Sequence, residues 1–231
     1  MAIGNQKYVV VVNSAKEKCY SILREQILNL ELKPGTLIST QNVADELSIS
    51  RTPVREAFLK LQEEHLLEIS HQKPSMVSRI DLHRVHQEFF VRKTLEIENM
   101  RNFVSNPSKI MVLKMQQNVE EQKEALEKQD YAMYQKLDNE FHEIPFMATG
   151  QELAASLIFR MNGHYYRSRM LVRKSREVSN DIIGEHEKLL ECIMKKDVEK
   201  TVELLQEHIY AIQPLQELLL KQWPEYFVQN C

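Results

Sequence analysis

The sequence predicts a mainly α protein with an N-terminal winged helix-turn-helix and a C-terminal all-α helical bundle. From residue 81 nearly to the end, apolar residues recur at helical spacing, and the 231 residues include only 5 Gly and 7 Pro. Before residue 81, a short helix, a tight turn and a second helix with a basic first turn precede two short alternating segments. We therefore expect two domains, a winged helix-turn-helix DNA-binding domain at residues 1–80 and an all-α helical domain at residues 81–231.

The composition is that of a globular protein, with 43% hydrophobic and 27% charged residues. The net charge is −3 and the pI is about 6.3, so any anion-binding surface must be a local patch. Cys19, Cys192 and Cys231 show no CxxC spacing, which favours reduced thiols in a cytosol. No segment approaches the roughly 18 consecutive apolar residues of a membrane span. We expect a cytoplasmic protein that does not enter the membrane.

The first two helices are predicted from their ends. "SAKE" is a capping box, in which the Ser14 side chain accepts a hydrogen bond from the amide of Glu17. "LKPG" ends the first helix, because Pro34 disfavours helical geometry at the residue before it. A short helix is expected over residues 40–47, followed by the three-residue turn "SIS".

The third helix begins in the stretch "SISRTPVREAFLKL". Ser50 or Thr52 can cap it, and Pro53 falls in the first turn, where its missing N–H costs nothing. Arg51 and Arg55 lie opposite an apolar stripe. The residues of that stripe are Val54, Ala57, Phe58 and Leu61. A helix of this kind fits the major groove of DNA with its N-terminal residues at the base edges.

A small hairpin, the wing, is predicted next over residues 66–80. Leu67 and Ile69 alternate, "HQKP" is typical of a turn, and residues 76–80 can return as a second strand. His71 and Lys73 would then lie at the tip, over the minor groove or the DNA backbone.

Six antiparallel helices are predicted for the remainder. Asp130 and Asp197 are candidate N-caps, and Pro145 is expected to bend or break its helix. The expected ranges are 81–104, 108–128, 131–148, 151–175, 180–195 and 198–221.

The segment "LKPGTLISTQNVADELSISRTPVREAFLKLQEEHLL" resembles the winged-helix head of the GntR family of bacterial transcription regulators, with "SRTPVREAF" as its most specific piece. "LDNEFH", "EHEKLLECI" and "EHI" resemble the helical effector domain of the FadR branch, the FCD type. The resemblance implies that Arg51 and Arg55 read guanines and that Ser50 and Thr52 contact phosphate. Independently, one arginine can bond two guanine acceptors at once.

Two departures from the family pattern affect the expected DNA contacts. Gln41 stands where some relatives carry a DNA-contacting arginine, and the wing "SHQKPSM" lacks the usual glycines at its tip. The wing does resemble the His-containing tip of fatty-acid-responsive members, which makes His71 a candidate groove contact. With so few contacts in each subunit, we expect a homodimer on palindromic double-stranded DNA.

A metal site is implied in the helical domain. Asp138 and His142 are spaced i, i+4 and share one helix face, while His186 and His208 lie in apolar helical segments. Taken singly, each histidine is more often an ordinary core or boundary residue. Together the four match the metal-binding subset of the FadR branch. One carboxylate and three imidazoles suit a divalent Zn, Ni, Mn or Co ion.

An octahedral ion with four protein ligands keeps two open positions, which a small organic-acid effector can fill. Arg92 is the first candidate for an effector-facing cation, although an Arg92–Glu96 helix pair explains it equally well. Arg160, Arg167 and Arg169 are weaker candidates. A sugar acid and a dicarboxylate both remain candidate effectors, whereas the set of metal-binding residues disfavours a fatty acyl group.

Three functions follow from these patterns. The leading hypothesis is a DNA-binding transcription regulator whose operator binding responds to an effector at the metal site; we expect a repressor, with activation left open as the alternative. In the second, the helical domain only dimerises, without metal or effector. The third, a metal-dependent hydrolase, is opposed by the lack of an HExxH helix and of a Ser or Cys nucleophile beside a base. We therefore expect no enzymatic activity.

Overall fold

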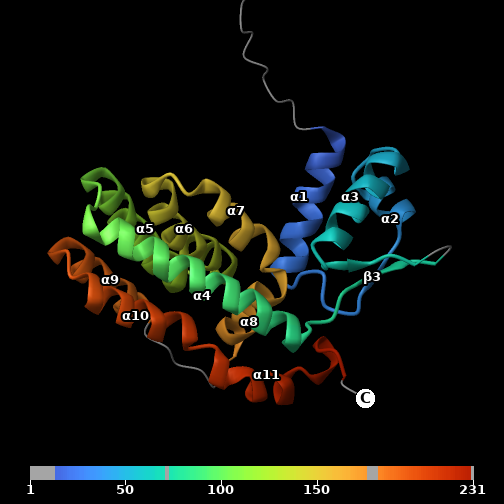
Figure 1. Cartoon of the computed structure of the whole chain (residues 1–231). Coiled ribbons are helices and arrows are strands. Elements are labelled where there is room, and N and C mark those ends of the chain that lie inside the picture. The colour runs from blue at the N-terminus through green and yellow to red at the C-terminus, as the bar shows by residue number, and fades with distance from the viewer. Residues whose placement is uncertain (1–13, 71–72, 176–181, 230–231) are drawn as a thin grey trace, which may run out of the picture.

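A winged-helix head and a helical bundle make up the computed structural model, which describes residues 14–70, 73–175 and 182–229. The predicted fold class is confirmed (Figure 1). None of the described helices is long and apolar enough to cross a membrane. The elements of the head are α1 (Ala15–Leu28), β1 (Leu37–Ile38), α2 (Thr40–Glu46), α3 (Arg51–Glu63), β2 (Leu67–Glu68) and β3 (Ser75–Val77). Those of the bundle are α4 (Leu82–Ser105), α5 (Lys109–Glu127), α6 (Tyr131–Thr149), α7 (Glu152–Met161), α8 (Gly163–Lys174), α9 (Ile182–Lys195) and α10 (Val198–Tyr210).

The helix-turn-helix of the head forms as the sequence predicts. The Ser14 hydroxyl accepts a hydrogen bond from the amide of Glu17 at 3.2 Å, which confirms the first cap. The predicted apolar stripe of α3 is buried and packs in one core with α1. Ser48 has a φ of 52°, the left-handed geometry that makes the turn into α3. Ser50 occupies the N-cap of α3, but no side chain makes the expected capping hydrogen bond there.

The wing is a three-stranded antiparallel sheet in the order β1-β3-β2. In its register Leu67 pairs with Val77. The return strand, expected over residues 76–80, ends at Val77. Ile80 instead forms an isolated parallel bridge with Phe227 near the C-terminus. His71 lies outside the described residues.

Two of the predicted bundle helices were wrong, because each is interrupted. The expected helix over 151–175 is α7 and α8, which meet at Asn162. A Cβ on Gly163 would lie 2.6 Å from Leu66 Cδ2, so any other residue here would force the buried Leu66 side chain to shift. The expected helix over 198–221 ends at Tyr210, and Pro214, which lacks an amide N–H, lies in a following 3-10 turn. That turn, η1 (Gln213–Leu215), precedes α11 (Gln216–Gln222) and η2 (Pro224–Tyr226).

The two predicted N-caps of the bundle agree with the structure, whereas the break expected at Pro145 does not occur. Asp130 accepts a hydrogen bond from the amide of Met133 at 2.9 Å, and Asp197 accepts one from the amide of Lys200 at 3.0 Å. Both predicted N-caps are therefore confirmed. Pro145 lies inside α6, which continues to Thr149, so the proline does not end this helix.

Helix α8 attaches the bundle to the head. His164 accepts a hydrogen bond from the amide of Asp81 through Nδ1 and donates one to the carbonyl of His65 through Nε2, both at 3.0 Å. Burial, helped by the charge of Arg167, lowers the pKa of His164 to about 2, so the imidazole stays neutral. Arg167 is fully buried and donates to the carbonyl of Ser78 at 2.6 Å.

The chain after α10 returns to the connection between head and bundle. Helix α11 packs on α8 and runs beneath it toward the head (Figure 1). The amide of Ile80 then donates to the carbonyl of Tyr226 at 2.8 Å, and the amide of Val228 donates to the carbonyl of Ile80 at 2.9 Å. Phe227 is fully buried in the core of the head. The C-terminal segment thus holds the connection at residue 80.

Candidate functional site

The N-terminal end of α3 presents a basic, outward-facing surface. Arg51 and Arg55 are exposed, and Ser50 and Thr52 are exposed beside them. No ion pair engages either arginine among the described residues. Helix α3 lies in the part of the head that faces away from the bundle (Figure 1). The two guanidinium groups are therefore available to a ligand from solution.

Gln41 and Lys73 extend this surface. Gln41 is exposed in the first turn of α2, where its side-chain amide donates to the Asp45 carboxylate at 2.7 Å. A ligand that binds Gln41 must compete with this contact. Lys73 is exposed beside the sheet, close to the wing position where His71 falls outside the described residues.

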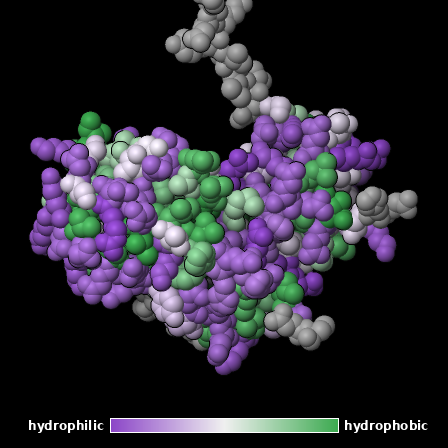
Figure 2. All heavy atoms as spheres, viewed as in Figure 1, coloured by the Kyte–Doolittle hydropathy of each residue, from purple (hydrophilic) through white to green (hydrophobic). Residues whose placement is uncertain are grey.

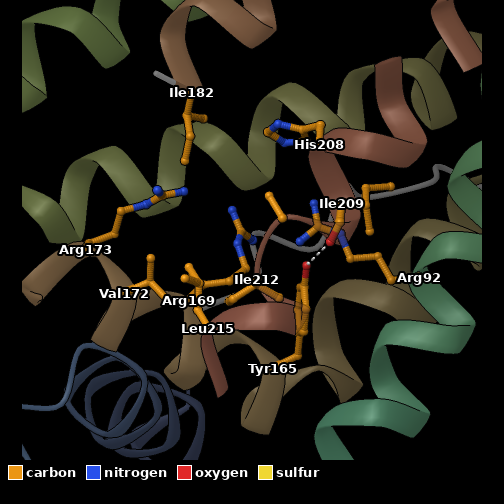
Figure 3. Close-up of a pocket in the computed structure, with 11 residues that line it drawn as sticks. Arg92, Tyr165, Arg169, Val172, Arg173, Ile182, His208, Ile209, Ile212 and Leu215 are labelled. Atoms are coloured by element: carbon orange, nitrogen blue, oxygen red, sulfur yellow. Dashed lines mark hydrogen bonds between the residues drawn. The ribbon is translucent and has the colours of Figure 1, made fainter. Parts of the chain in front are cut away.

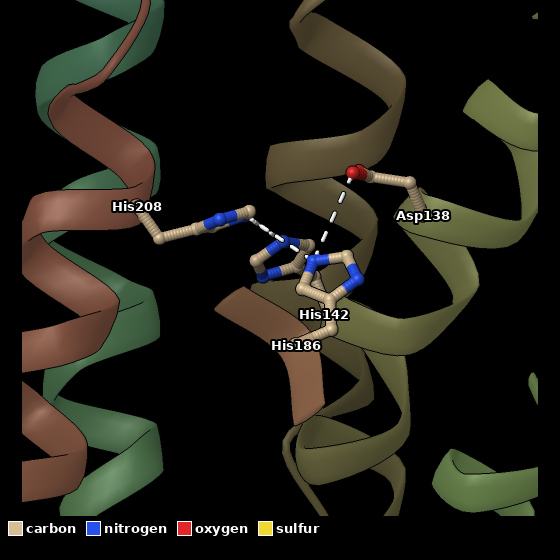
Figure 4. Close-up of side chains that lie close together, drawn as sticks. All are labelled: Asp138, His142, His186 and His208. Carbon is tan, nitrogen blue, oxygen red and sulfur yellow. Dashed lines mark hydrogen bonds and ion pairs between the residues drawn. The ribbon is translucent and has the colours of Figure 1, made fainter. Parts of the chain in front are cut away.

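Four predicted ligand residues meet in the bundle. Asp138 and His142 come from α6, His186 from α9 and His208 from α10 (Figure 4). One donor atom from each lies within 4.8 Å of all the others. The Nε2 atom of His208 is 3.0 Å from that of His142 and 3.3 Å from that of His186. The chain therefore gathers a carboxylate and three imidazoles around one point.

Each imidazole is oriented by a polar side chain behind it, so its Nε2 atom points into the cluster. Partners of this kind fix the tautomer of metal-binding histidines. The contacts are Glu96 to His142 Nδ1 at 2.8 Å, Gln122 Oε1 to His186 Nδ1 at 2.9 Å, and Glu185 to His208 Nδ1 at 2.7 Å. Sequence reasoning missed these roles, because the three partners come from different helices with no shared motif.

The protonation states of His142 and Asp138 are those of metal ligands. Burial lowers the pKa of His142 to about 4, so its imidazole is neutral. Burial alone would raise the pKa of Asp138, but the neighbouring positive charges, led by that of Arg169, together outweigh it, and the pKa lies well below its usual range. Asp138 Oδ1 is buried and has no hydrogen-bond partner among the described residues. An ionised oxygen and three converging nitrogen lone pairs fit a divalent transition-metal ion.

A cavity adjoins the cluster and is lined by three arginines and His208 (Figure 3). Arg92 lines it and also pairs with Glu96 at 2.5 Å, so the expected helix pair is present and the same guanidinium group borders the cavity. Arg169 pairs with Asp138. Arg173 reaches the cavity one turn further along α8, at i+4 from Arg169, a spacing that sequence reasoning did not use.

The other two arginines considered as effector contacts lie elsewhere. Arg160 is exposed at the end of α7, where its carbonyl accepts a 3.4 Å hydrogen bond from Arg24 of the head. Arg167 is bound to Ser78 at the junction described above. Of the three weaker candidates, Arg169 alone lines the cavity.

A winged helix-turn-helix with free arginines at the start of α3, joined to a helical bundle with a cavity lined by three further arginines, defines a DNA-binding transcription regulator. Comparison with known families agrees. Residues 15–77 match the bacterial regulatory proteins of the gntR family, and residues 87–211 match the FCD domain. The chain belongs to the GntR family and carries an FCD domain.

Relatives across nearly the whole chain are transcription regulators rather than enzymes, as is this chain. It is 26% identical over 196 residues to the HTH-type transcriptional repressor RspR of Escherichia coli (strain K12), covering 85% of this chain and 86% of RspR. It is also 26% identical over 212 residues to an uncharacterized HTH-type regulator of Streptomyces ambofaciens, covering 92% and 89%.

Solved structures show the same fold. E. coli McbR/YncC matches with a TM-score of 0.76 at 22% identity, covering 91% of this chain and 99% of that one. A putative GntR regulator from Rhodococcus sp. RHA1 matches with a TM-score of 0.75 at 16% identity, covering 90% and 98%.

Proposed function

We propose that this protein is a metal- and effector-responsive repressor. Residues 1–80 bind a palindromic operator, and residues 81–231 dimerise and bind the effector. The observation that carries the proposal is the outward-facing pair Arg51 and Arg55 on a winged-helix head joined to the Asp–His₃ cluster. The similarity to RspR, named a repressor, supports the direction of regulation. Such a regulator acts in the cytoplasm, where bacterial DNA lies.

DNA reading is assigned to the start of α3. Arg51 and Arg55 each bond a guanine in the major groove, while Ser50 and Thr52 hold phosphates at the helix N-terminus. Gln41 on α2 and the wing residues His71 and Lys73 add contacts to the same half-site. Support comes from the exposure of every one of these residues that the structure describes.

Binding to its own promoter tests this function. We expect the purified protein to prefer a duplex from the region upstream of its gene over a random duplex. The observed affinity should fall steeply as salt rises, because each phosphate contact releases counterions. Fluorescence anisotropy at several salt concentrations measures both quantities. Equal affinity for the two duplexes contradicts the proposal.

Sensing is assigned to the cluster and the cavity beside it. Asp138, His142, His186 and His208 hold one divalent ion (Zn, Ni, Mn or Co), which supplies Lewis acidity toward an anionic effector. A small carboxylate effector would bind in the cavity beside the cluster, with Arg92 as one of its cationic contacts. A bundle that only dimerised would have no need for three imidazoles whose Nε2 atoms converge.

The C-terminal segment offers a physical route from the cavity to the head. Ile212 and Leu215 line the cavity, and Phe227 of the same segment is buried in the head beside Ile80. A ligand that moves the cavity wall therefore pulls on the connection that positions α3. Such coupling is reciprocal, so DNA weakens effector binding by the factor by which effector weakens DNA binding.

The homodimer is assigned to a hydrophobic face shared by α4 and α7. On α4, Phe90 is 69% exposed, and on α7, Leu153 and Leu157 are 75% and 50% exposed. Figure 2 shows hydrophobic side chains gathered over α7 and the neighbouring part of α4. A groove between the two helices is lined by Val91 and Met161, among others. A second copy of the same face fits, because reading a palindrome requires two heads related by a twofold axis.

Replacing Leu157 by aspartate should break the dimer, because the single twofold interface would then bury two unpaired carboxylates, one from each copy of the chain. We expect the mass at micromolar concentration to fall from twice 27.3 kDa to 27.3 kDa in sedimentation equilibrium. Ile110→Asp on α5, which is 67% exposed outside this face, is the matched control and should stay dimeric. The assignment is wrong if Leu157→Asp stays dimeric or if both variants dissociate alike.

A further inference from the structure

One arginine of the head is bound to the bundle at the end of α7. Arg24 of α1 donates through Nη2 to the carbonyl of Phe159 at 3.1 Å and to that of Arg160 at 3.4 Å. Both carbonyls lie in the last turn of α7, where a helix offers its own carbonyl groups no amide partner. Figure 1 shows this end of α7 beside α1. The head is therefore attached to α7 as well as to α8.

A buried carboxylate holds Arg24 in this position. Glu64 accepts a hydrogen bond from Arg24 Nε at 2.7 Å, and the Glu64 side chain is 5% exposed. The hydroxyl of the buried Tyr20 donates to the other oxygen of the same carboxylate. Glu64 is also the C-cap of α3. This Arg24 clamp, made of Arg24, Glu64 and the two α7 carbonyls, joins the C-terminal end of α3 to the C-terminal end of α7.

The two helices joined by the Arg24 clamp carry the two surfaces that a dimer needs to read a palindrome. Helix α3 carries Arg51 and Arg55 at its other end. Helix α7 carries Leu153 and Leu157 of the dimer face proposed above. In the dimer, a direct path from one α3 to the other therefore runs through both clamps and the two α7 helices.

A small movement at the clamp becomes a large movement on DNA. Helix α3 has 13 residues, which make a rod of about 20 Å. A tilt of about 10° about the clamped end therefore moves Arg51 by about 3.4 Å, the rise of one base pair. Resting on the dimer face proposed above, we propose that Arg24 is a specificity-determining positioning residue that sets the spacing between the two operator half-sites. It holds α3 at one angle to α7, so the two reading ends lie at one separation.

The test measures affinity against half-site spacing. The full-length protein is footprinted on the duplex from the region upstream of its gene, and duplexes are then made with one base pair inserted or deleted between the two half-sites. One base pair turns one half-site by about 34° about the DNA axis, so a fixed pair of heads cannot contact both half-sites fully. Wild type should lose roughly 10-fold or more in affinity on both altered duplexes, as measured by fluorescence anisotropy.

Arg24→Lys removes the clamp and keeps the charge. The single ammonium group of lysine can pair with Glu64, but it lacks the fork of donors that also reaches the α7 carbonyls. This variant should bind the altered duplexes within about threefold of the natural one, because heads that are free to tilt populate several separations. Lys60→Met is the matched control, since Lys60 joins α3 to α1 through Glu17 at 3.0 Å within the head. It should keep the full loss of wild type.

Three results overturn the inference: wild type tolerates the altered spacing, Arg24→Lys keeps the full loss, or Lys60→Met relaxes the spacing as much as Arg24→Lys does. Failure of the function proposed above is a separate observation. In that case the footprint covers a single half-site, and the inference falls with the dimeric operator. The fluorescence of Trp223, the one tryptophan of the chain, reports whether each variant is folded, because this side chain packs against the core of the head.

Glu64→Gln gives a second measurement that decides the question even if Arg24→Lys folds poorly. The amide keeps the shape of the carboxylate and can still accept a hydrogen bond from the Tyr20 hydroxyl. Without the negative charge it holds Arg24 less tightly, so the loss on the altered duplexes should shrink to about half that of wild type or less. An unchanged loss in Glu64→Gln overturns the role of Glu64 in the clamp.

Discussion

Replacing Arg51 or Arg55 by alanine is expected to weaken operator binding by roughly 1–3 kcal/mol for each half-site. A dimer carries the change twice, so the total is about 2–6 kcal/mol, or a loss of about 30-fold to about 10⁴-fold. The reason is that each arginine supplies two donors to one guanine, and alanine supplies none. Anisotropy titrations at one fixed salt concentration measure the loss.

The specificity of these variants matters more than their affinity. An arginine that reads a guanine should lose its preference at one base pair in each half-site, so operators changed there should bind wild type and variant more nearly alike. Lys73→Ala is the matched control on the wing. It should weaken all sequences alike and reduce the salt slope by about 1 for each phosphate that the variant no longer neutralises. If the arginine variants also lose affinity uniformly, the two residues position the head and do not read bases.

The arginine-to-alanine changes are not expected to destabilise the fold, so the comparison of DNA affinities stays valid. Both arginines are exposed, and they lie four residues apart on one stripe of α3. Like charges at that spacing repel by a few tenths of a kcal/mol in the free helix, so alanine should leave stability unchanged or slightly higher. The unfolding midpoint in urea checks this directly.

The head could be predicted in detail because its signals are local. The alternation of Arg51 and Arg55 with the buried stripe on α3 is visible within 14 residues, and Ser14 caps its own helix. The same holds for Asp130 and Asp197, whose partners lie three residues further along. Where the cap and the buried face of a helix both involve residues of that same helix, the sequence is sufficient to predict the helix.

The breaks in two of the expected bundle helices could not be predicted, and neither could the side chains that orient the clustered histidines. Both depend on distant parts of the chain. Gly163 signals a close approach, but only the fold identifies Leu66, almost one hundred residues earlier, as the neighbour. Gln122 and Glu185 orient histidines on other helices, across 64 and 23 residues. A resemblance to known relatives named the ligands, whereas the charges around them required the structure.

Replacing His186 by alanine is expected to abolish tight binding of a divalent ion. We expect the tag-free protein to hold about one ion per chain by mass spectrometry of metals, and the variant to lose it. The affinity should fall by more than the 10- to 100-fold that follows from removing an outer partner. Gln122→Ala removes such a partner of His186 and should show that smaller loss. The two variants together separate a ligand from the group that orients it.

The thermal stability of the protein gives an independent measure of ion binding. An ion that binds the folded protein alone stabilises it by about 2.7 kcal/mol at a free concentration of 100 times its Kd. Wild type should therefore unfold at a higher temperature with Zn²⁺ than with a chelator, and His186→Ala should show no such difference. His83→Ala, at an exposed position on α4, is the matched control and should respond like wild type.

His186 is fully buried and its ring stacks on Phe141 with centroids 4.2 Å apart, so alanine there also leaves a cavity. His208→Ala gives a second test of the ligand set, because His208 lies on another helix and its ring stacks on His142, with centroids 5.0 Å apart, and not on Phe141. If the four clustered residues hold the ion, both variants should lose it, although their stabilities differ. If wild type holds no ion and ignores the chelator, the imidazoles are a polar core, and the bundle dimerises without sensing a metal.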